Sequence, residues 1–147
     1  RLGEEQIQES NYTLDELSEY IQDILAKAME IRDQETDNQS KKILKKALDY
    51  IEENYAQESL SLHTAASAVN VSANYFSAIF SQEMEMTFIE YVTSKRMEKA
   101  KKLLRQTEKH ASEIALEVGY KDPHYFSFVF KKTQGYTPRE YRMGAKS

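Results

Sequence analysis

The most informative side chains lie in residues 124–142, HYFSFVFKKTQGYTPREYR, where aromatic rings stand beside two lysines. His124, Ser127, Phe128 and Lys131 lie three or four residues apart, so they share one face of a helix. An exposed ring on such a face can contact a thymine methyl in the major groove, and an ammonium group can bind phosphate. The pattern therefore favours a DNA-reading surface. The alternative is that Phe128 packs beneath the preceding helix.

The remainder of the chain indicates no catalytic chemistry. Its histidines, His63, His110 and His124, fall in unrelated segments, and it has no Cys, no Gly-rich phosphate loop and no HExxH pattern. We therefore expect no enzyme activity, no catalytic residues, no metal site and no cofactor.

Nothing in the sequence indicates an oxidising compartment, and we expect a cytoplasmic protein. No apolar run approaches the roughly 20 residues of a membrane span, so we expect no membrane contact from this chain. Its start at Arg1 suggests a piece of a longer protein.

The formal net charge of −4 combines two parts of opposite sign. Residues 1–60 carry 7 Lys or Arg against 15 Asp or Glu, whereas residues 61–147 carry 13 against 9. This asymmetry indicates an anion-binding carboxyl-terminal part with an acidic appendage. Some of its cations are expected to be solvated, and Lys131 and Lys132 are the best placed for phosphate. The residues expected to supply phosphate-binding charge are Lys95, Arg96, Lys99, Lys101, Lys102, Arg105, Lys109, Lys121, Lys131, Lys132, Arg139 and Arg142.

Residues 74–91 resemble residues 124–141 closely enough to indicate an internal duplication. A shift of 50 residues makes seven of eighteen positions identical. In each copy a small residue, Ala66 or Ala115, suits a close crossing of two helices. Four positions later, Asn70 or Gly119 tolerates the positive φ of a tight turn. Each copy is therefore predicted to be a helix-turn-helix, whose second helix buries Phe76, Ile79 and Phe80 in one copy and Phe126, Val129 and Phe130 in the other.

A single helix is expected to connect the two motifs. Thr87-Phe88-Ile89-Glu90 has the form of a capping box, and apolar residues continue at helical spacing to about Arg105. Eighteen residues at a rise of 1.5 Å make a rod of roughly 27 Å. Such a rod could hold two recognition helices about 34 Å apart, one turn of B-DNA, so that both enter the major groove. The expected boundaries are about 61–82 for the first motif, 87–105 for the connecting helix and 111–132 for the second motif.

The first 40 residues are predicted to form a helical linker or dimerisation segment. Residues 13–16 have the form of a capping box. Residues 33–40, DQETDNQS, contain no apolar side chain and are interpreted as a linker, after which a second helix is expected to run to about Tyr55. Within this segment, a stripe of apolar residues runs along the first predicted helix. The stripe predicts either self-association or packing on the chain's own core or on a neighbouring domain. It has the heptad spacing of a coiled coil and comprises Leu14, Leu17, Ile21, Ile24, Ala28 and Ile31.

Residues from about Lys41 to Arg142 resemble the DNA-binding domain of the AraC family of bacterial transcription regulators. The resemblance is carried by SEIALEVG, residues 112–119, and by YKDPHYFSFVFKKTQGYTPREYR, residues 120–142. It implies an all-α fold of seven helices, with two helix-turn-helix subdomains joined by a central connecting helix. Here an amino-terminal helix with the short heptad stripe precedes them, so we expect domains at residues 1–40 and 41–145. The implied partners are double-stranded promoter DNA and RNA polymerase, and the implied function is control of transcription, usually activation.

The same resemblance implies roles for individual residues. The base-reading positions of the family fall on Asn74, Ser77 and Ala78 in the first copy and on His124, Ser127 and Phe128 in the second. Phosphate contacts are expected from Ser72, Ser81, Gln82, Lys121, Lys131, Lys132 and Arg139.

Two departures from the family pattern lie in the first copy. Glu85 stands where the family usually has the Gly that Gly135 supplies in the second copy, so this turn is expected to be looser or strained. Residues 72–82 contain no Lys or Arg, so this half should bind modestly and a homodimer is expected to be needed for tight binding. The alternative function is a helical protein–protein interaction module. Such arrays usually have shorter repeats and at least about three units, and their binding need not fall with salt.

Overall fold

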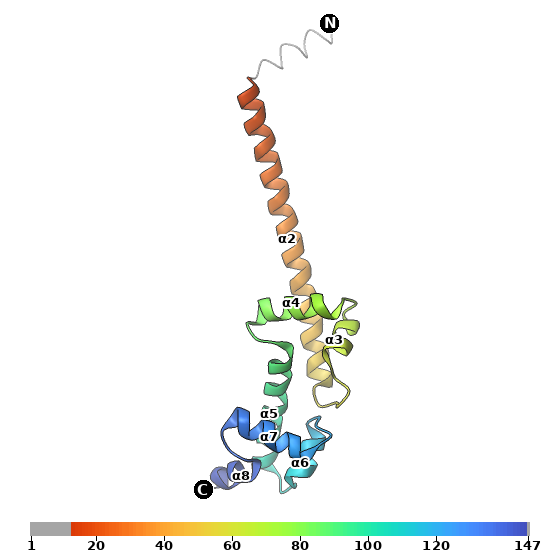
Figure 1. The fold of residues 1–147 in the computed structure, drawn as a ribbon, viewed down its shortest axis with the longest axis vertical. Coiled ribbons are helices and arrows are strands. Elements are labelled where there is room, and N and C mark those ends of the chain that lie inside the picture. Colours follow the sequence, from red (N-terminus) through yellow and green to blue (C-terminus); the bar gives the residue numbers. More distant parts are fainter. Residues whose placement is uncertain (1–12, 147) are drawn as a thin grey trace. The chain divides into compact units, whose positions relative to one another are not determined.

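The computed structural model describes residues 13–146, and every regular element in that range is a helix (Figure 1). The all-α prediction, with two helix-turn-helix subdomains and a central connecting helix, is confirmed. No helix within the described range is long and apolar enough to span a membrane. The helices are α2 (Leu14–Asn54), α3 (Leu62–Ala68), α4 (Ala73–Met84), α5 (Phe88–Gln106), α6 (Ala111–Glu117), α7 (Pro123–Gln134) and α8 (Pro138–Lys146).

The chain divides into two compact units, residues 1–40 and residues 41–147. Residues 1–12 of the predicted amino-terminal segment lie outside the described residues. The capping box predicted at the start of α2 is present. The Glu16 N–H donates to Thr13 Oγ1 at 3.2 Å, and the Thr13 N–H donates to Glu16 Oε2 at 3.3 Å. All six residues of the heptad stripe are exposed, Leu14 to 85%, so the stripe does not pack into a core of the described chain.

The predicted linker at residues 33–40 is wrong, because α2 is continuous through it. The polar composition of DQETDNQS indicated a break, but polar side chains are compatible with an exposed helix. The segment contains neither Gly nor Pro, the two residues that most disfavour a helix interior. The second predicted helix is therefore the carboxyl-terminal part of α2, which ends at Asn54.

Residues 41–147 contain two separate hydrophobic clusters. In the first, Phe76 and Phe80 of α4 pack with Ala47 and Ile51 of α2 and with Phe88 at the start of α5. In the second cluster, the rings of α7 pack against the other half of α5 and against α6. Its buried members include Met97, Ala100, Leu104, Ile114, Phe126 and Phe130. The predicted buried faces of α4 and α7 are confirmed, with Val129 only half-buried. The helix α5 therefore contributes to both cores.

The caps of α5 differ slightly from the prediction. Thr87 Oγ1 accepts the Glu90 N–H at 3.1 Å, as predicted. The Glu90 carboxylate does not return the bond to the Thr87 N–H, so Thr87 is a simple N-cap and not half of a capping box. A capping box that the sequence did not suggest lies at α3. There Ser61 Oγ accepts the Thr64 N–H at 3.2 Å, and Thr64 Oγ1 accepts the Ser61 N–H at 2.8 Å.

Four turns adopt positive φ, as the duplication predicts. Asn70 and Gly119 follow the first helix of each motif, with φ of 59° and 106°. Glu85 and Gly135 follow the second helices, with φ of 56° and 87°. Glu85 is thus a non-glycine residue in the left-handed region, and the turn is the strained one of the two predicted options.

Replacing Glu85 with Gly is therefore expected to raise the free energy of unfolding by about 0.5–1 kcal/mol, because Gly adopts positive φ without a Cβ clash. Urea denaturation would measure the change. The matched control is Gly135→Ala, which places a Cβ at the equivalent turn where φ is 87°. It should lower the same free energy by about 1 kcal/mol. A Glu85→Gly chain no more stable than the original would show that the turn carries no strain.

Candidate nucleic-acid interface

The helix α7 is fixed by its caps and its buried rings. Pro123 occupies the first helical position, and the Asp122 carboxylate caps the helix by accepting the His124 N–H at 2.9 Å. Phe126 and Phe130 are fully buried and hold one face of α7 in the second cluster. The opposite face is therefore presented to solvent.

The solvent face of α7 carries the three side chains predicted to read bases. His124 and Phe128 are exposed and Ser127 is half-buried. Phe128 is 61% exposed, so the alternative that it packs beneath the preceding helix is wrong. Its ring stacks on that of Tyr125, with centroids 6.5 Å apart and planes 26° apart. Lys132 Nζ lies over the same ring at 5.9 Å from its centroid.

Tyr125 is a candidate contact that the sequence analysis missed. Its side chain, identical with that of Tyr75 in the first copy, is 57% exposed. The spacing of Tyr125, Phe128 and Lys132, three and then four residues, was the available signal, because side chains so spaced are neighbours on a helix. The three form a continuous aromatic and cationic surface.

The helix α4 presents a neutral surface. Ser72 caps it, its hydroxyl oxygen accepting the Tyr75 N–H at 3.2 Å. Asn74 and Ala78 are exposed and Ser77 is half-buried. Ser81 and Gln82 are exposed in the last turns of the helix. The predicted residues therefore lie together on α4, with hydrogen-bonding groups but without a cation.

Four of the predicted phosphate-binding cations are exposed near α7. Lys131 and Lys132 lie in its last turn, Lys121 precedes its N-cap, and Arg139 lies in the first turn of α8. Among the described residues, no carboxylate is within ion-pair distance of any of these four. Their charge is therefore available to an anion.

Arg96 has a structural role instead of the predicted phosphate-binding one. Its Nε donates to the Tyr55 carbonyl at 2.7 Å and its Nη2 donates to the Gln57 carbonyl at 3.0 Å. Its guanidinium lies 5.2 Å from the centroid of the Tyr120 ring. A Cβ on Gly119 would approach Arg96 Nε to 2.9 Å, so only Gly fits beside it. Burial raises the pKa of the Tyr120 phenol, which stays a neutral hydroxyl beside this cation at physiological pH. Arg96 therefore ties the end of α2 to α5 and to the second motif.

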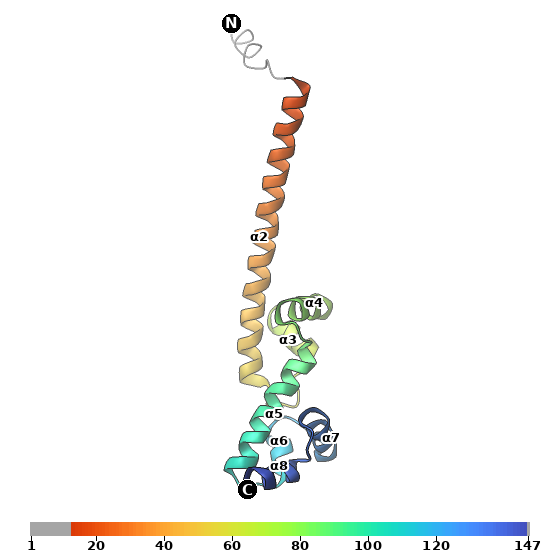
Figure 2. The same ribbon diagram turned by 90° about the vertical axis from the view of Figure 1, so that its left-hand side faces the viewer.

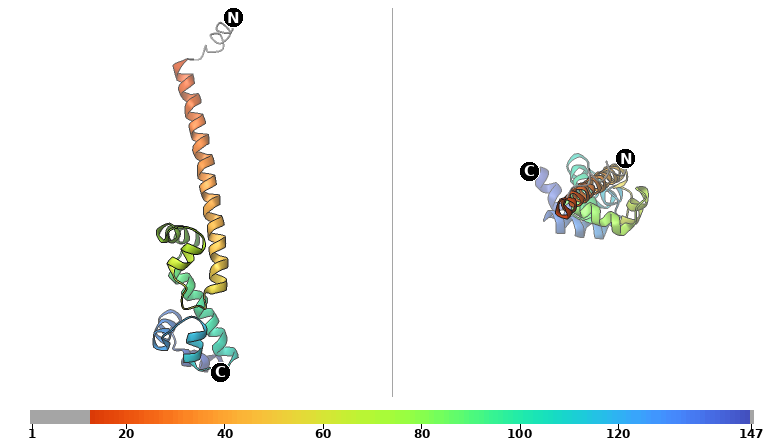
Figure 3. Two further views of the ribbon diagram at one scale, coloured as in Figure 1. Left: turned by 90° about the vertical axis from the view of Figure 1, so that its right-hand side faces the viewer. Right: turned by 90° about the horizontal axis from the view of Figure 1, so that it is seen from above.

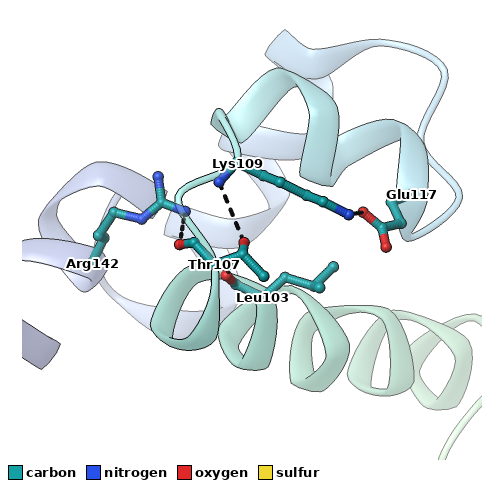
Figure 4. A network of polar contacts seen from close by, with 5 residues as sticks. All are labelled: Leu103, Thr107, Lys109, Glu117 and Arg142. Atoms are coloured by element: carbon teal, nitrogen blue, oxygen red, sulfur yellow. Dashed lines mark hydrogen bonds and ion pairs between the residues drawn. The ribbon is translucent and has the colours of Figure 1, made fainter.

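Arg142 is a second structural cation (Figure 4). Its Nε donates to the Leu104 carbonyl and its Nη2 donates to the Thr107 carbonyl, both at 3.1 Å. The same turn is held by Lys109, whose Nζ lies 2.8 Å from Glu117 Oε2. These contacts join the end of α5 to α6 and α8. Of the other predicted phosphate ligands, Lys95 pairs with Glu52, Lys101 with Glu98, and Arg105 donates to the Tyr141 hydroxyl.

The two second helices lie on the same side of α5. Figure 2 shows α4 and α7 both beside α5 and both viewed nearly end on, and Figure 3 (left) shows the same arrangement from the opposite side. Their axes therefore run in similar directions. No cluster of metal-ligating side chains occurs within the described range.

A family model described as a helix-turn-helix domain matches residues 65–144. The melibiose operon regulatory protein of Escherichia coli K12 is 36% identical over 95 residues, which are 65% of this chain and 31% of that protein. Among solved structures, the carboxyl-terminal domain of AraT, a response regulator from Geobacillus stearothermophilus, is 43% identical with a TM-score of 0.68. The match covers 69% of this chain and 84% of that one. The DNA-binding domain of AdpA, solved with a target DNA, has a TM-score of 0.65 and is 20% identical. This match covers 69% of this chain and 90% of that one, and it shows a likeness of fold.

The chain spans about a third of the length of the curated relatives, which are bacterial regulators with 31% and 32% of their length matched. The family model runs from within α3 to within α8 of this chain, across both helix-turn-helix motifs.

Proposed function

This chain belongs to the AraC-type family of DNA-binding transcription regulators, and from this we propose that it reads one duplex with α4 and α7 in successive major grooves. The observation that carries the proposal is the common side of α5 on which both helices lie. The family and the fold are those of the DNA-binding domains of transcription regulators and not those of enzymes.

The two helices would contribute unequally. His124, Ser127 and Phe128 would contact base edges from α7, where Phe128 suits a thymine methyl. Phosphates would be bound by Lys121, Lys131, Lys132 and Arg139, the four cations without a carboxylate partner near α7. On α4, Asn74 suits adenine, and Ser77 and Ala78 lie beside it. Ser72, Ser81 and Gln82 would donate neutral hydrogen bonds to phosphates. Since neutral donors release no counterions, α4 would add specificity and little salt-dependent affinity.

Full activity would require a second chain and a polymerase. The exposed heptad stripe of α2 has the self-complementary spacing of a coiled coil, which supports a homodimer. The family resemblance supports transcription activation through RNA polymerase. Because its DNA target is bacterial chromosomal DNA, the protein would act in the cytoplasm.

Selection of binding sites from random duplexes, followed by salt titration of the best site, tests the proposal. The selected duplexes are expected to share two short sequence elements, or boxes, about one helical turn apart. The logarithm of the binding constant should fall with the logarithm of the salt concentration, with a slope of roughly −0.9 for each phosphate neutralised. A single box would contradict the role of α4. Selection of no box at all would contradict the whole proposal.

Replacing Phe128 with Ala is expected to remove the preference for one A·T pair, worth about 1 kcal/mol, because the ring contact with the thymine methyl is lost. Stability should change by less than about 0.5 kcal/mol, since the ring is 61% exposed. The measurement is a repeat of the site selection with the variant. Tyr136→Ala is the matched control, because it removes a 55% exposed ring outside α7 and should leave every preferred base unchanged. If the Phe128→Ala variant selects the same DNA sequence as the original chain, Phe128 does not contact the bases.

A further inference from the structure

The helix α5 carries a charged groove that DNA reading does not use. The groove has a volume of about 240 Å³. It is lined by Glu52 of α2, by Tyr55 directly after α2, and by five charged residues of α5 from Lys95 to Arg105. It lies wholly within residues 41–147.

The groove has unpaired positive charge. Its two carboxylates are already occupied, Glu52 by Lys95 at 2.5 Å and Glu98 by Lys101 at 2.9 Å. Lys99 and Lys102 have no carboxylate within ion-pair distance among the described residues. Arg105 contributes one nitrogen to the Tyr141 hydroxyl and keeps its full charge. Three cations without a carboxylate partner therefore lie along two turns of α5, with Lys102 and Arg105 exposed and Lys99 half-buried.

Lys99, Lys102 and Arg105 form a cationic stripe, and the two lysines of this stripe point away from the proposed DNA surface. Thr93 and Met97 of α5 line a different groove, which they share with Phe128 and Lys132 of α7. At 100° a residue, Lys99 and Lys102 lie about 200° and about 140° around the helix from Met97, on the opposite face, whereas Arg105 lies only about 80° from it, at the edge of the stripe. A helix about 10 Å across thus separates the stripe from the duplex that α7 would enter. Lys99 and Lys102 are therefore on the wrong face of α5 to neutralise phosphates of that duplex.

We propose that the stripe binds an acidic segment of a protein partner while the domain is on DNA. The inference rests on the proposed function, since that assigns the other face of α5 to the duplex. Charge complementarity favours carboxylates as the ligand. The groove is too small for the backbone of a second duplex and accepts a few side chains. The half-buried ring of Tyr55 offers an apolar contact between the charges. The fitting ligand is a short acidic peptide with an apolar residue among its carboxylates.

The test uses a fluorescent peptide of about 12 residues, alternating Asp and Glu around a central Leu, titrated with the full chain. Anisotropy is measured on the free chain and on the chain saturated with its selected duplex. The peptide is expected to bind both forms. Lys99→Glu with Lys102→Glu should weaken peptide binding by about tenfold or more, and duplex affinity should change by less than about threefold.

The matched variant is Lys131→Glu with Lys132→Glu, which makes the same change in net charge on α7. It should weaken duplex binding and leave peptide binding to the free chain nearly unchanged. Three outcomes would overturn the proposal: no measurable peptide binding, displacement of the peptide by the duplex, or a loss of duplex affinity in the Lys99 and Lys102 variant that matches its loss of peptide affinity. The last outcome would mean that the stripe binds nucleic acid. The proposed DNA function is tested separately by the duplex titration of the Lys131 and Lys132 variant. Unchanged duplex affinity in that variant would contradict the DNA function without affecting the result for the peptide.

Discussion

A chain with Lys131→Glu and Lys132→Glu is expected to lose about 100-fold in affinity for its selected duplex at physiological salt, or roughly 1.4 kcal/mol for each side chain. Both cations are exposed in the last turn of α7 and neither faces a carboxylate in the described structure. Since each released counterion contributes about 0.9 to the logarithmic salt slope, the slope should become shallower by about two. Titrations at several salt concentrations measure both quantities.

The control for this prediction is Lys45→Glu with Lys46→Glu. These neighbouring lysines are exposed on α2, so the variant has the same net charge without altering α7. Its loss of affinity measures the general effect of charge on a polyanion, and the difference between the two variants isolates the α7 contact. Equal losses would show that Lys131 and Lys132 act only through net charge.

Replacement of Arg96 by Ala is expected to lower the free energy of unfolding by about 2–4 kcal/mol. The change removes two charged hydrogen bonds, to the carbonyls of Tyr55 and Gln57, and the contact with the Tyr120 ring. Arg96→Lys should recover only part of the loss, because a single ammonium cannot reproduce the planar fork. Urea denaturation gives the values, with an unchanged m-value as the check that the transition remains comparable.

Arg139→Ala is the matched control for Arg96. It deletes an exposed guanidinium with no partner among the described residues and should alter stability by less than about 0.5 kcal/mol. Duplex affinity should respond in the opposite order, falling for Arg139→Ala while the folded fraction of Arg96→Ala still binds. An Arg96→Ala chain as stable as the Arg139 control would show that the guanidinium does not hold the two motifs together.

The features that sequence predicted well are local. Asn70 and Gly119 can be recognised as turn residues because few residues tolerate positive φ. The helical spacing of the rings in α4 and α7 predicts which face of each helix is buried. The role of the cations was harder to predict. Arg96 bonds to carbonyls 41 and 39 residues away, and Arg142 to carbonyls 38 and 35 residues away. Main-chain carbonyls leave no trace in the sequence, so these residues looked like any other surface charge.

The error at residues 33–40 has a different origin. A stretch without apolar residues has no periodicity, and periodicity is the main signal by which a helix is recognised from sequence. Such a stretch can continue a helix that residues on both sides have already started, because extending a helix costs far less than nucleating one. The exposure of Tyr125 was missed because the predicted face of this helix was built on His124, Ser127, Phe128 and Lys131 alone.

Under the proposed function, the two separate cores joined by α5 would make the domain a bivalent ligand for DNA. Once α7 was bound, α4 would meet the same duplex at an effective concentration in the millimolar range, set by α5 and not by the amount of protein in the cell. A motif with a dissociation constant of about 0.1 mM, too weak to act alone, would then raise the overall affinity roughly tenfold when its box matches and hardly at all when it does not. The neutral surface of α4 suits this position, because a second motif that bound any phosphate backbone tightly would strengthen binding to every sequence equally.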